Sequence, residues 1–189
     1  MMESILTKYF ERIYGRNLTI DEEASILNSF KLETFKKKQL VFSNGDANTK
    51  HYFVTKGLLR LYIIDPLGKE FNVLFAKEGQ MIGDLATPLP TSFFLETIEE
   101  SSVFSIEDDQ LRDLTSDFSK IVATIKRSYI FLQKRYISIL SKTAEENYED
   151  LITEYPDLVK RLPQYHISSY LGVTSVFLSQ IMAKRARKR

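Results

Sequence analysis

The chain has 189 residues, of which 43% are hydrophobic and 27% are charged, and its formal net charge is +1. These proportions are ordinary for a globular protein and exclude a disordered or fibrous chain, while the length suits two unequal domains. The chain has no cysteine, which excludes disulfides, thiolate zinc sites and cysteine-ligated iron–sulfur clusters.

The sequence lacks the residues that several classes of function require. His51 and His166 are the only histidines, so we expect no metal site and no cofactor. We do not expect an enzyme, because the sequence has no phosphate-binding glycine loop and no nucleophile–base constellation. No apolar run is long enough to span a membrane, and Glu3 and Lys8 interrupt the N-terminal segment, which excludes a secretory signal. We therefore expect a cytoplasmic protein with no membrane partner.

The first element that the sequence predicts is a short amphipathic helix after Leu18. Thr19 and Glu22 have the spacing of a capping box, in which each side chain bonds to the backbone of the other residue. Apolar residues follow at helical spacing, namely Ala24, Ile26, Leu27 and Phe30.

Residues 34–106 have the pattern of several short β-strands. Runs rich in aromatic and branched residues are separated, about every ten residues, by glycine- and proline-containing turns. The segments 59–63 and 71–75 alternate in polarity on either side of Asp65-Pro66-Leu67-Gly68, which is typical of a hairpin. Strands at this spacing predict a β-barrel or β-roll.

Beyond Asp109 the strand pattern gives way to one long helix, because neither proline nor glycine occurs between Phe118 and Tyr155. Tyr155-Pro156 should end the helical region. Apolar residues step alternately by four and three, the spacing of a helix that packs along its length on another helix. They are Phe118, Val122, Ile125, Tyr129, Leu132, Tyr136 and Ile139. This seam either packs on its own domain or joins two chains, and its unbroken length favours a homodimer.

The segment after Pro163 predicts two short helices joined at Gly172, as in a helix-turn-helix. Either Thr174 or Ser175 can cap the second helix. The apolar residues that should join the two helices are Ile167, Tyr170, Leu171, Phe177, Leu178 and Ile181.

The outward face of the second helix carries side chains that suit a DNA groove. The candidate DNA-binding residues are Thr174, Ser175, Val176, Ser179, Gln180, Lys184 and Arg185. Serine and glutamine can hydrogen-bond base edges, valine can contact a thymine methyl group, and the basic residues can hold phosphates. Any helical hairpin with a glycine turn can have this pattern, so the pattern alone does not establish DNA binding. The charge distribution provides a second test.

Charge is unevenly divided along the chain. Asp157 is the last acidic residue, and the segment 158–189 carries seven basic residues, whereas the rest of the chain has 19 basic and 25 acidic residues. An acidic body with a basic end is typical of nucleic-acid binding, in which cations replace the counterions of the phosphates. The alternative is a disordered basic tail that aids solubility. A helix-turn-helix within the basic segment favours DNA binding.

Three sequence motifs, followed by the long helix and this terminal hairpin, resemble those of Crp/Fnr-family regulators. The motifs are Lys56-Gly57-Leu58-Leu59-Arg60-Leu61-Tyr62, Asp65-Pro66-Leu67-Gly68-Lys69-Glu70 and Gly83-Asp84-Leu85. The match covers nearly the whole chain and is most similar to short forms known from Bacteroidetes-type bacteria, in which the segment 141–146 joins the dimer helix to the DNA-binding part.

The resemblance implies an α+β fold with three parts. They are a double-stranded β-helix, or jelly-roll-like β-roll, of cyclic-nucleotide-binding type over residues 1–116, a dimerisation helix over 117–141 and a helix-turn-helix domain over 142–189. It implies double-stranded DNA as the partner of a homodimer. RNA polymerase and an unidentified small-molecule effector are further candidate partners.

The predicted effector pocket departs from the family pattern. Members that bind cyclic AMP carry a Gly-Glu pair, whose glutamate bonds the ribose, and an Arg-Ser or Arg-Thr pair, whose arginine neutralises the phosphate. This chain has Gly83-Asp84 and Thr91-Ser92 instead, and no lysine or arginine occurs between Lys77 and Arg112. The degenerate pocket is assigned to Gly83, Asp84, Leu85, Thr91, Ser92, Leu132 and Gln133. We expect neither cyclic AMP nor cyclic GMP as effector, and Asp84 has the alternative role of capping a turn.

The leading hypothesis is therefore a dimeric, sequence-specific DNA-binding transcription regulator. The alternative is a signalling module that binds a small molecule or a protein through the β-roll without specific DNA binding. The basic C-terminal segment favours the first, because it predicts an affinity for DNA that falls steeply with salt.

Overall fold

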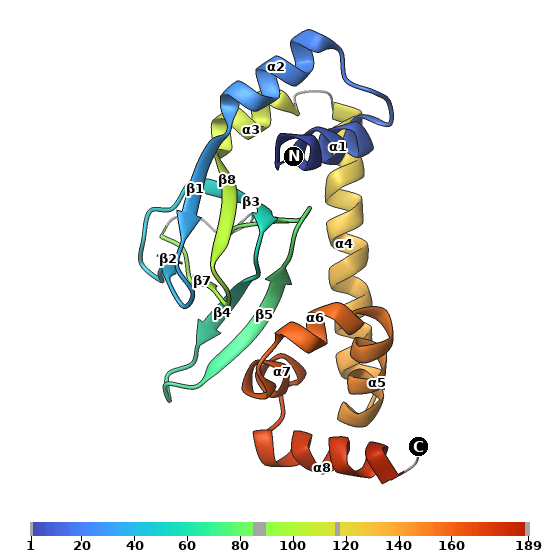
Figure 1. The fold of residues 1–189 in the computed structure, drawn as a ribbon. Helices are drawn as coiled ribbons and strands as arrows, with labels where there is room; N and C mark the ends of the chain where they lie inside the picture. The colour runs from blue at the N-terminus through green and yellow to red at the C-terminus, as the bar shows by residue number, and fades with distance from the viewer. Residues whose placement is uncertain (1, 85–89, 116–117, 188–189) are drawn as a thin grey trace. The chain divides into compact units, whose positions relative to one another are not determined.

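The computed structural model describes residues 2–84, 90–115 and 118–187, which divide into two compact units (Figure 1). The first unit comprises Met1–Tyr62 and Phe75–Ser128, and the second comprises Ile63–Leu74 and Tyr129–Arg189. None of the helices in the described residues is both long and apolar enough to cross a membrane.

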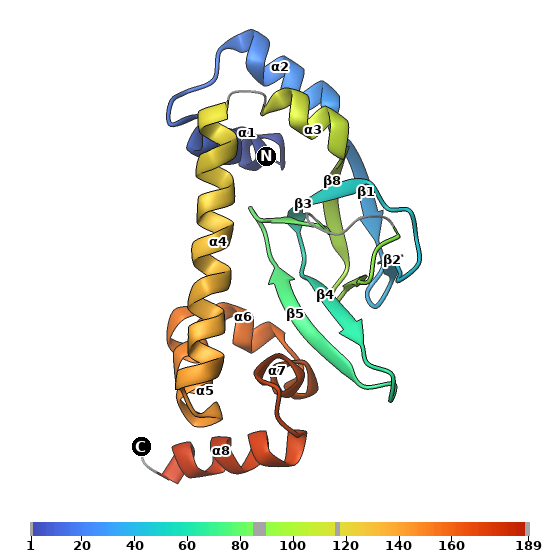
Figure 2. The ribbon, with the colours of Figure 1, turned by 180° about the vertical axis from the view of Figure 1, so that it is seen from behind.

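The strands form two four-stranded antiparallel sheets. One has the order β1-β8-β3-β6 and the other the order β2-β7-β4-β5. Figure 1 labels these strands except β6, and Figure 2 shows the ribbon from behind. Their bounds are β1 Lys31–Phe35, β2 Leu40–Phe42, β3 Lys50–Lys56, β4 Leu59–Ile64, β5 Glu70–Ala76, β6 Met81–Ile82, β7 Phe94–Thr97 and β8 Ser101–Glu107. Each sheet combines strands that are distant in sequence, as in a β-roll, and the predicted α+β fold is confirmed.

The predicted turn between β4 and β5 closes through its aspartate. The Asp65 carboxylate accepts hydrogen bonds from the backbone N–H groups of Leu67 and Lys69, at 2.8 and 2.9 Å. Before β4, Gly57 has φ +100°, and a Cβ there would lie 2.2 Å from the Ser101 Oγ atom. Only glycine suits both constraints, which explains the Lys-Gly pair in the motif that precedes the strand.

Three helices accompany the first sheet within the first unit: α1 Met2–Tyr14, α2 Ile20–Ser29 and α3 Asp108–Leu114. The helix predicted after Thr19 is α2, and its capping box is formed with Glu22. The sequence analysis predicted neither α1 nor α3. The helices and the sheet share a core that consists of Leu6, Phe10, Ile26, Phe30, Phe53, Phe104 and Ile106.

The remaining helices are α4 Phe118–Ser141, α5 Ala144–Glu154, α6 Pro156–Arg161, α7 Gln164–Leu171 and α8 Ser175–Arg187. The long helix predicted from Phe118 is α4, which ends at Ser141, and Thr143 then caps a new helix through a capping box with Glu146. Pro156 does not end the helical region. It is the first residue of α6, a position at which the missing N–H of proline costs no helical bond.

Candidate functional site

The two C-terminal helices, α7 and α8, meet at a tight turn. Gly172 adopts the left-handed conformation, with φ 71° and ψ 22°, and the backbone N–H of Val173 bonds to the carbonyl of Ser168 at 3.0 Å. The Thr174 hydroxyl accepts a hydrogen bond from the N–H of Phe177 at 3.1 Å and so caps α8. The turn thereby fixes the direction of α8 relative to α7.

A small apolar core joins α7 to α8. Ile167, Leu178 and Ile181 are at most 4% exposed, as predicted for the inner faces of the pair. The prediction that Phe177 also faces inward is wrong, because 47% of this residue is exposed. Leu178 and Ile181, one turn apart, fill the inner face, and Phe177 precedes this line by about 100° around the helix.

Five of the seven candidate DNA-binding residues make hydrogen bonds within the chain. Thr174 caps α8, the Ser175 hydroxyl lies 3.1 Å from that of Ser168, and the Ser179 hydroxyl donates to the Ser175 carbonyl. Val176, which is 70% exposed, and Gln180, which is also exposed, project from the same face without such a bond in the described residues.

The two basic candidates are paired with carboxylates of α5. Lys184 Nζ lies 2.7 Å from Glu145 Oε2, and Arg185 Nε lies 2.7 Å from Glu149 Oε1. These pairs tie α8 to α5 within the second unit. The sequence analysis assigned both cations to phosphates and did not foresee the two glutamates.

A hydrogen-bond network between the β4–β5 hairpin and α7 was also missed. The buried Asn72 side-chain amide donates to the carbonyl of His166 at 3.1 Å and lies 3.3 Å from His166 Nδ1. The Asn72 backbone N–H donates to the Ser169 hydroxyl, which itself donates to the Glu70 carbonyl. His166 thus has a structural role in joining α7 to the hairpin, and no local sequence pattern could have indicated these contacts.

The predicted seam on α4 is exposed on the single chain. Six of its residues are between 44% and 64% exposed, namely Val122, Ile125, Tyr129, Leu132, Tyr136 and Ile139. The side chain of the seventh, Phe118, lies outside the described residues. Water solvates large apolar side chains poorly, and such a row is typical of an interaction surface.

Of the residues predicted to form an effector pocket, the structure brings Asp84 and Thr91 together. Thr91 is 1% exposed, and its hydroxyl donates to Asp84 Oδ2 at 2.5 Å while accepting the N–H of Phe93 at 3.2 Å. The threonine is therefore satisfied within the protein.

The other residues predicted for the pocket differ in burial. Gly83 is buried, and a Cβ there would lie only 3.2 Å from His51 Nδ1. Ser92, Leu132 and Gln133 are exposed, and Leu85 lies outside the described residues. Of the predicted set, Gly83 and Thr91 are thus buried, and Asp84 is half-buried.

Sequence comparison finds two matches that agree with this geometry. Residues 32–118 match the model of the cyclic nucleotide-binding domain. The anaerobic regulatory protein of Aggregatibacter actinomycetemcomitans is 26% identical over 164 residues, which cover 78% of this chain. The aligned region spans 64% of the length of that relative.

Two solved structures show the same fold at low sequence identity. A CooA mutant from Carboxydothermus hydrogenoformans has a TM-score of 0.70 at 16% identity, covering 94% of this chain and 84% of its own. FixK2 from Bradyrhizobium japonicum has a TM-score of 0.68 at 18% identity, covering 84% of this chain and 85% of its own. The β-roll and the C-terminal helices therefore occur together in other proteins of this architecture.

Proposed function

We propose that the chain is a Crp/Fnr-family transcription regulator and not an enzyme, and that it binds specific DNA sequences as a cytoplasmic homodimer. In this proposal residues 1–116 are the sensor domain, residues 117–141 the dimerisation helix and residues 142–189 the DNA-binding domain. The comparison with short Bacteroidetes-type forms stays a prediction, as does contact with RNA polymerase.

The observation that carries the proposal is the α7–Gly172–α8 turn with an outward polar face on α8. A helix presented in this way enters the major groove of DNA, where its first turns reach base edges. Val176 and Gln180 are exposed on those turns and suit contacts to a thymine methyl group and to an adenine edge. The remaining candidates, Thr174, Ser175, Ser179, Lys184 and Arg185, orient α8 and stand beside the backbone phosphates.

The exposed seam on α4 supports a dimer with two such helices. Two-fold pairing through α4 would present two copies of α8 to one face of DNA. Their half-sites should be one helical turn apart, about 34 Å between centres.

The experiment that tests this function is selection of bound fragments from the host genome by the purified full-length protein, followed by a salt titration of the best fragment. With about five phosphate contacts per protomer, the logarithm of affinity should fall with the logarithm of salt concentration at a slope of about −9. Selection of no common sequence would favour the alternative, a β-roll signalling module that does not bind specific DNA.

We further propose that the effector pocket does not take cyclic AMP or cyclic GMP. A buried phosphate needs a charged hydrogen-bond donor, and the Thr91 hydroxyl is neutral and already donates to Asp84. The pocket is then a retained architecture with altered ligand chemistry.

A further inference from the structure

The first unit has a pocket whose lining includes neither Asp84 nor Thr91. Its volume is about 410 Å³, within the range of pockets that hold small molecules. Its wall consists of one face of α1, the turn before β6, the α3 helix and the early part of α4.

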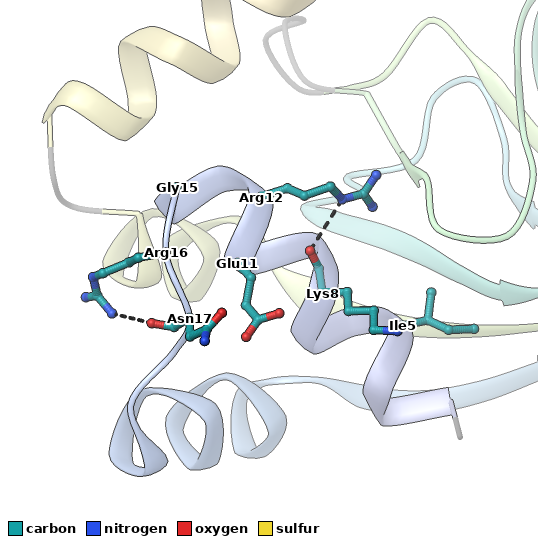
Figure 3. A pocket seen from close by; sticks show the side chains of 7 residues that line it. All are labelled: Ile5, Lys8, Glu11, Arg12, Gly15, Arg16 and Asn17. Carbon is teal, nitrogen blue, oxygen red and sulfur yellow. Dashed lines mark hydrogen bonds between the residues drawn. The ribbon is translucent and has the colours of Figure 1, made fainter.

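The polar groups in this wall are cationic or neutral. Arg12 from α1 and Arg127 from α4 line the pocket, and none of the lining residues is a carboxylate. Within the described part of the chain neither guanidinium is ion-paired. Arg12 donates through Nε to the carbonyl of Lys8, at 3.3 Å, and its Cζ atom lies 5.9 Å from the centre of the Tyr9 ring. Figure 3 shows the Arg12 guanidinium turned away from Glu11 and Arg16, which line the neighbouring hollow on α1.

A phenol lies beside the two cations. Burial raises the pKa of Tyr9, although the charges of Arg12 and Arg127 act against this change. Tyr9 therefore stays protonated at neutral pH, and its hydroxyl remains a hydrogen-bond donor. Two guanidinium groups and a phenol give the pocket donors, and none of the described lining residues is a carboxylate that could balance the two positive charges.

The rest of the wall is largely apolar, with Ile13, Met81, Leu111 and Ile125 from four different elements. We propose that this pocket binds a small organic anion with an apolar body, its carboxylate or phosphate between Arg12 and Arg127 and its hydrocarbon part against these side chains. Guanidinium groups hold such head groups through paired, charge-assisted hydrogen bonds. Neither a cation nor a purely polar anion would use both parts of the wall.

The position of the pocket gives the ligand a regulatory consequence. Ile125 belongs both to this wall and to the exposed seam of α4. A bound anion would therefore contact the helix through which the dimer forms, together with α1 and α3. In naming an effector site the inference rests on the proposed function, whereas binding itself does not require DNA.

Calorimetric titration of the full-length protein with octanoate tests the assignment, with 1-octanol as the neutral probe of equal chain length. We expect saturable binding of octanoate below about 1 mM, and binding of 1-octanol at least about tenfold weaker. Equal affinity for the two probes, or no binding of octanoate at that concentration, would overturn the proposal.

Variants locate the binding. Arg12→Gln and Arg127→Gln should each weaken octanoate binding about tenfold, because each removes a charge-assisted donor. Lys8→Gln is the matched control, since Lys8 is an exposed cation on α1 that lines only the neighbouring hollow (Figure 3). An equal loss in all three variants would indicate unspecific attraction of anions and would contradict the site. Because the titration contains no DNA, its failure would leave the proposed DNA binding intact.

Discussion

The residues predicted to form an effector pocket in the β-roll differ from the exposed faces of α4 and α8 in how their side chains are satisfied. In the pocket, the Thr91 hydroxyl donates to Asp84, so two polar groups that could meet a ligand meet each other. On α4, apolar side chains such as Tyr136, which is 64% exposed, find no cover within the chain. On α8, Val176 and Gln180 point outward.

This difference predicts opposite responses of the two regions to a ligand or a partner. A site whose polar groups are satisfied internally gains little from a ligand, because binding must first break the internal bond. A helix that leaves apolar groups in water gains free energy when another chain covers it. The following predictions test the comparison, beginning with the surface that should respond most strongly.

The largest effect is expected on α4. Replacing Ile125 and Leu132 together with glutamate should convert the dimer into a monomer, with the dissociation constant raised at least about a thousandfold. Two carboxylates on each protomer would be placed in an apolar interface, where an unpaired charge costs several kcal/mol. Light scattering of the purified variant measures the change.

Ile20→Glu is the control for that experiment. Ile20 is 87% exposed on α2, so its replacement adds a charge without touching the seam, and the protein should stay dimeric. If the α4 double variant also stayed dimeric, the apolar row on α4 would not be the interface.

A smaller and more local effect is expected on α8. Gln180→Ala should relax the preference for one base pair in each half-site, at a cost of about 1–3 kcal/mol for the preferred sequence. Binding to an operator and to single-base variants of it, measured by fluorescence anisotropy, gives the preference at each position. Gln164→Ala on α7 is the control, because Gln164 is exposed but lies outside α8. A loss that was equal for all DNA sequences would contradict base contact by Gln180.

Cyclic nucleotides should bind to the predicted effector pocket only when position 91 carries a positive charge. Wild-type protein should show no saturable binding of cyclic AMP or cyclic GMP at low micromolar concentration in calorimetry. The double variant Thr91→Arg and Asp84→Glu should gain about tenfold or more, since an ionic hydrogen bond contributes about 1.5–3 kcal/mol. Tight binding to the wild type would show that Thr91 suffices. Failure of the double variant to bind would mean that the cavity is filled or reshaped.

Local patterns in the sequence predicted those parts of the fold that local interactions determine. The capping box of Thr19 with Glu22, the Asp65 turn and the left-handed Gly172 are each set by residues within a few positions of one another. The helix α1 was not predicted, because its stability comes from Leu6 and Phe10 packing on strands more than 40 residues away. The break before α5 was expected only from the family resemblance, although Thr143 and Glu146 have the local spacing of a capping box.

The candidate site was predictable to the same extent. The exposed face of α8 followed from helical periodicity, whereas the bonds that involve Asn72, Glu145 and Glu149 join elements that are distant in sequence. A single sequence contains no signal for such pairs. The charge excess of the segment 158–189 therefore suggested free cations where the structure has ion pairs with α5.

Those ion pairs lead to the smallest expected effect. If Lys184 and Arg185 contact phosphates, each cation must break or share its ion pair with a glutamate of α5. The free energy of that ion pair then opposes DNA binding. Such pairs contribute at most about 1 kcal/mol. The variants Glu145→Gln and Glu149→Gln should therefore each raise DNA affinity by no more than about fivefold, equally for all sequences.

Salt titration and a control variant decide what the pairs do. Glu154→Gln removes an exposed carboxylate from the end of α5, away from the paired positions, and serves as the matched control. A gain in affinity for Glu145→Gln and Glu149→Gln beyond that of the control would show that the α5 carboxylates compete with phosphate. Weaker binding would mean instead that the ion pairs hold α8 in place for the groove, and Lys184→Ala would then reduce the melting temperature as well as the affinity. Unchanged affinity in both variants would mean that Lys184 and Arg185 do not contact phosphates. Recognition of DNA would then depend on the first turns of α8.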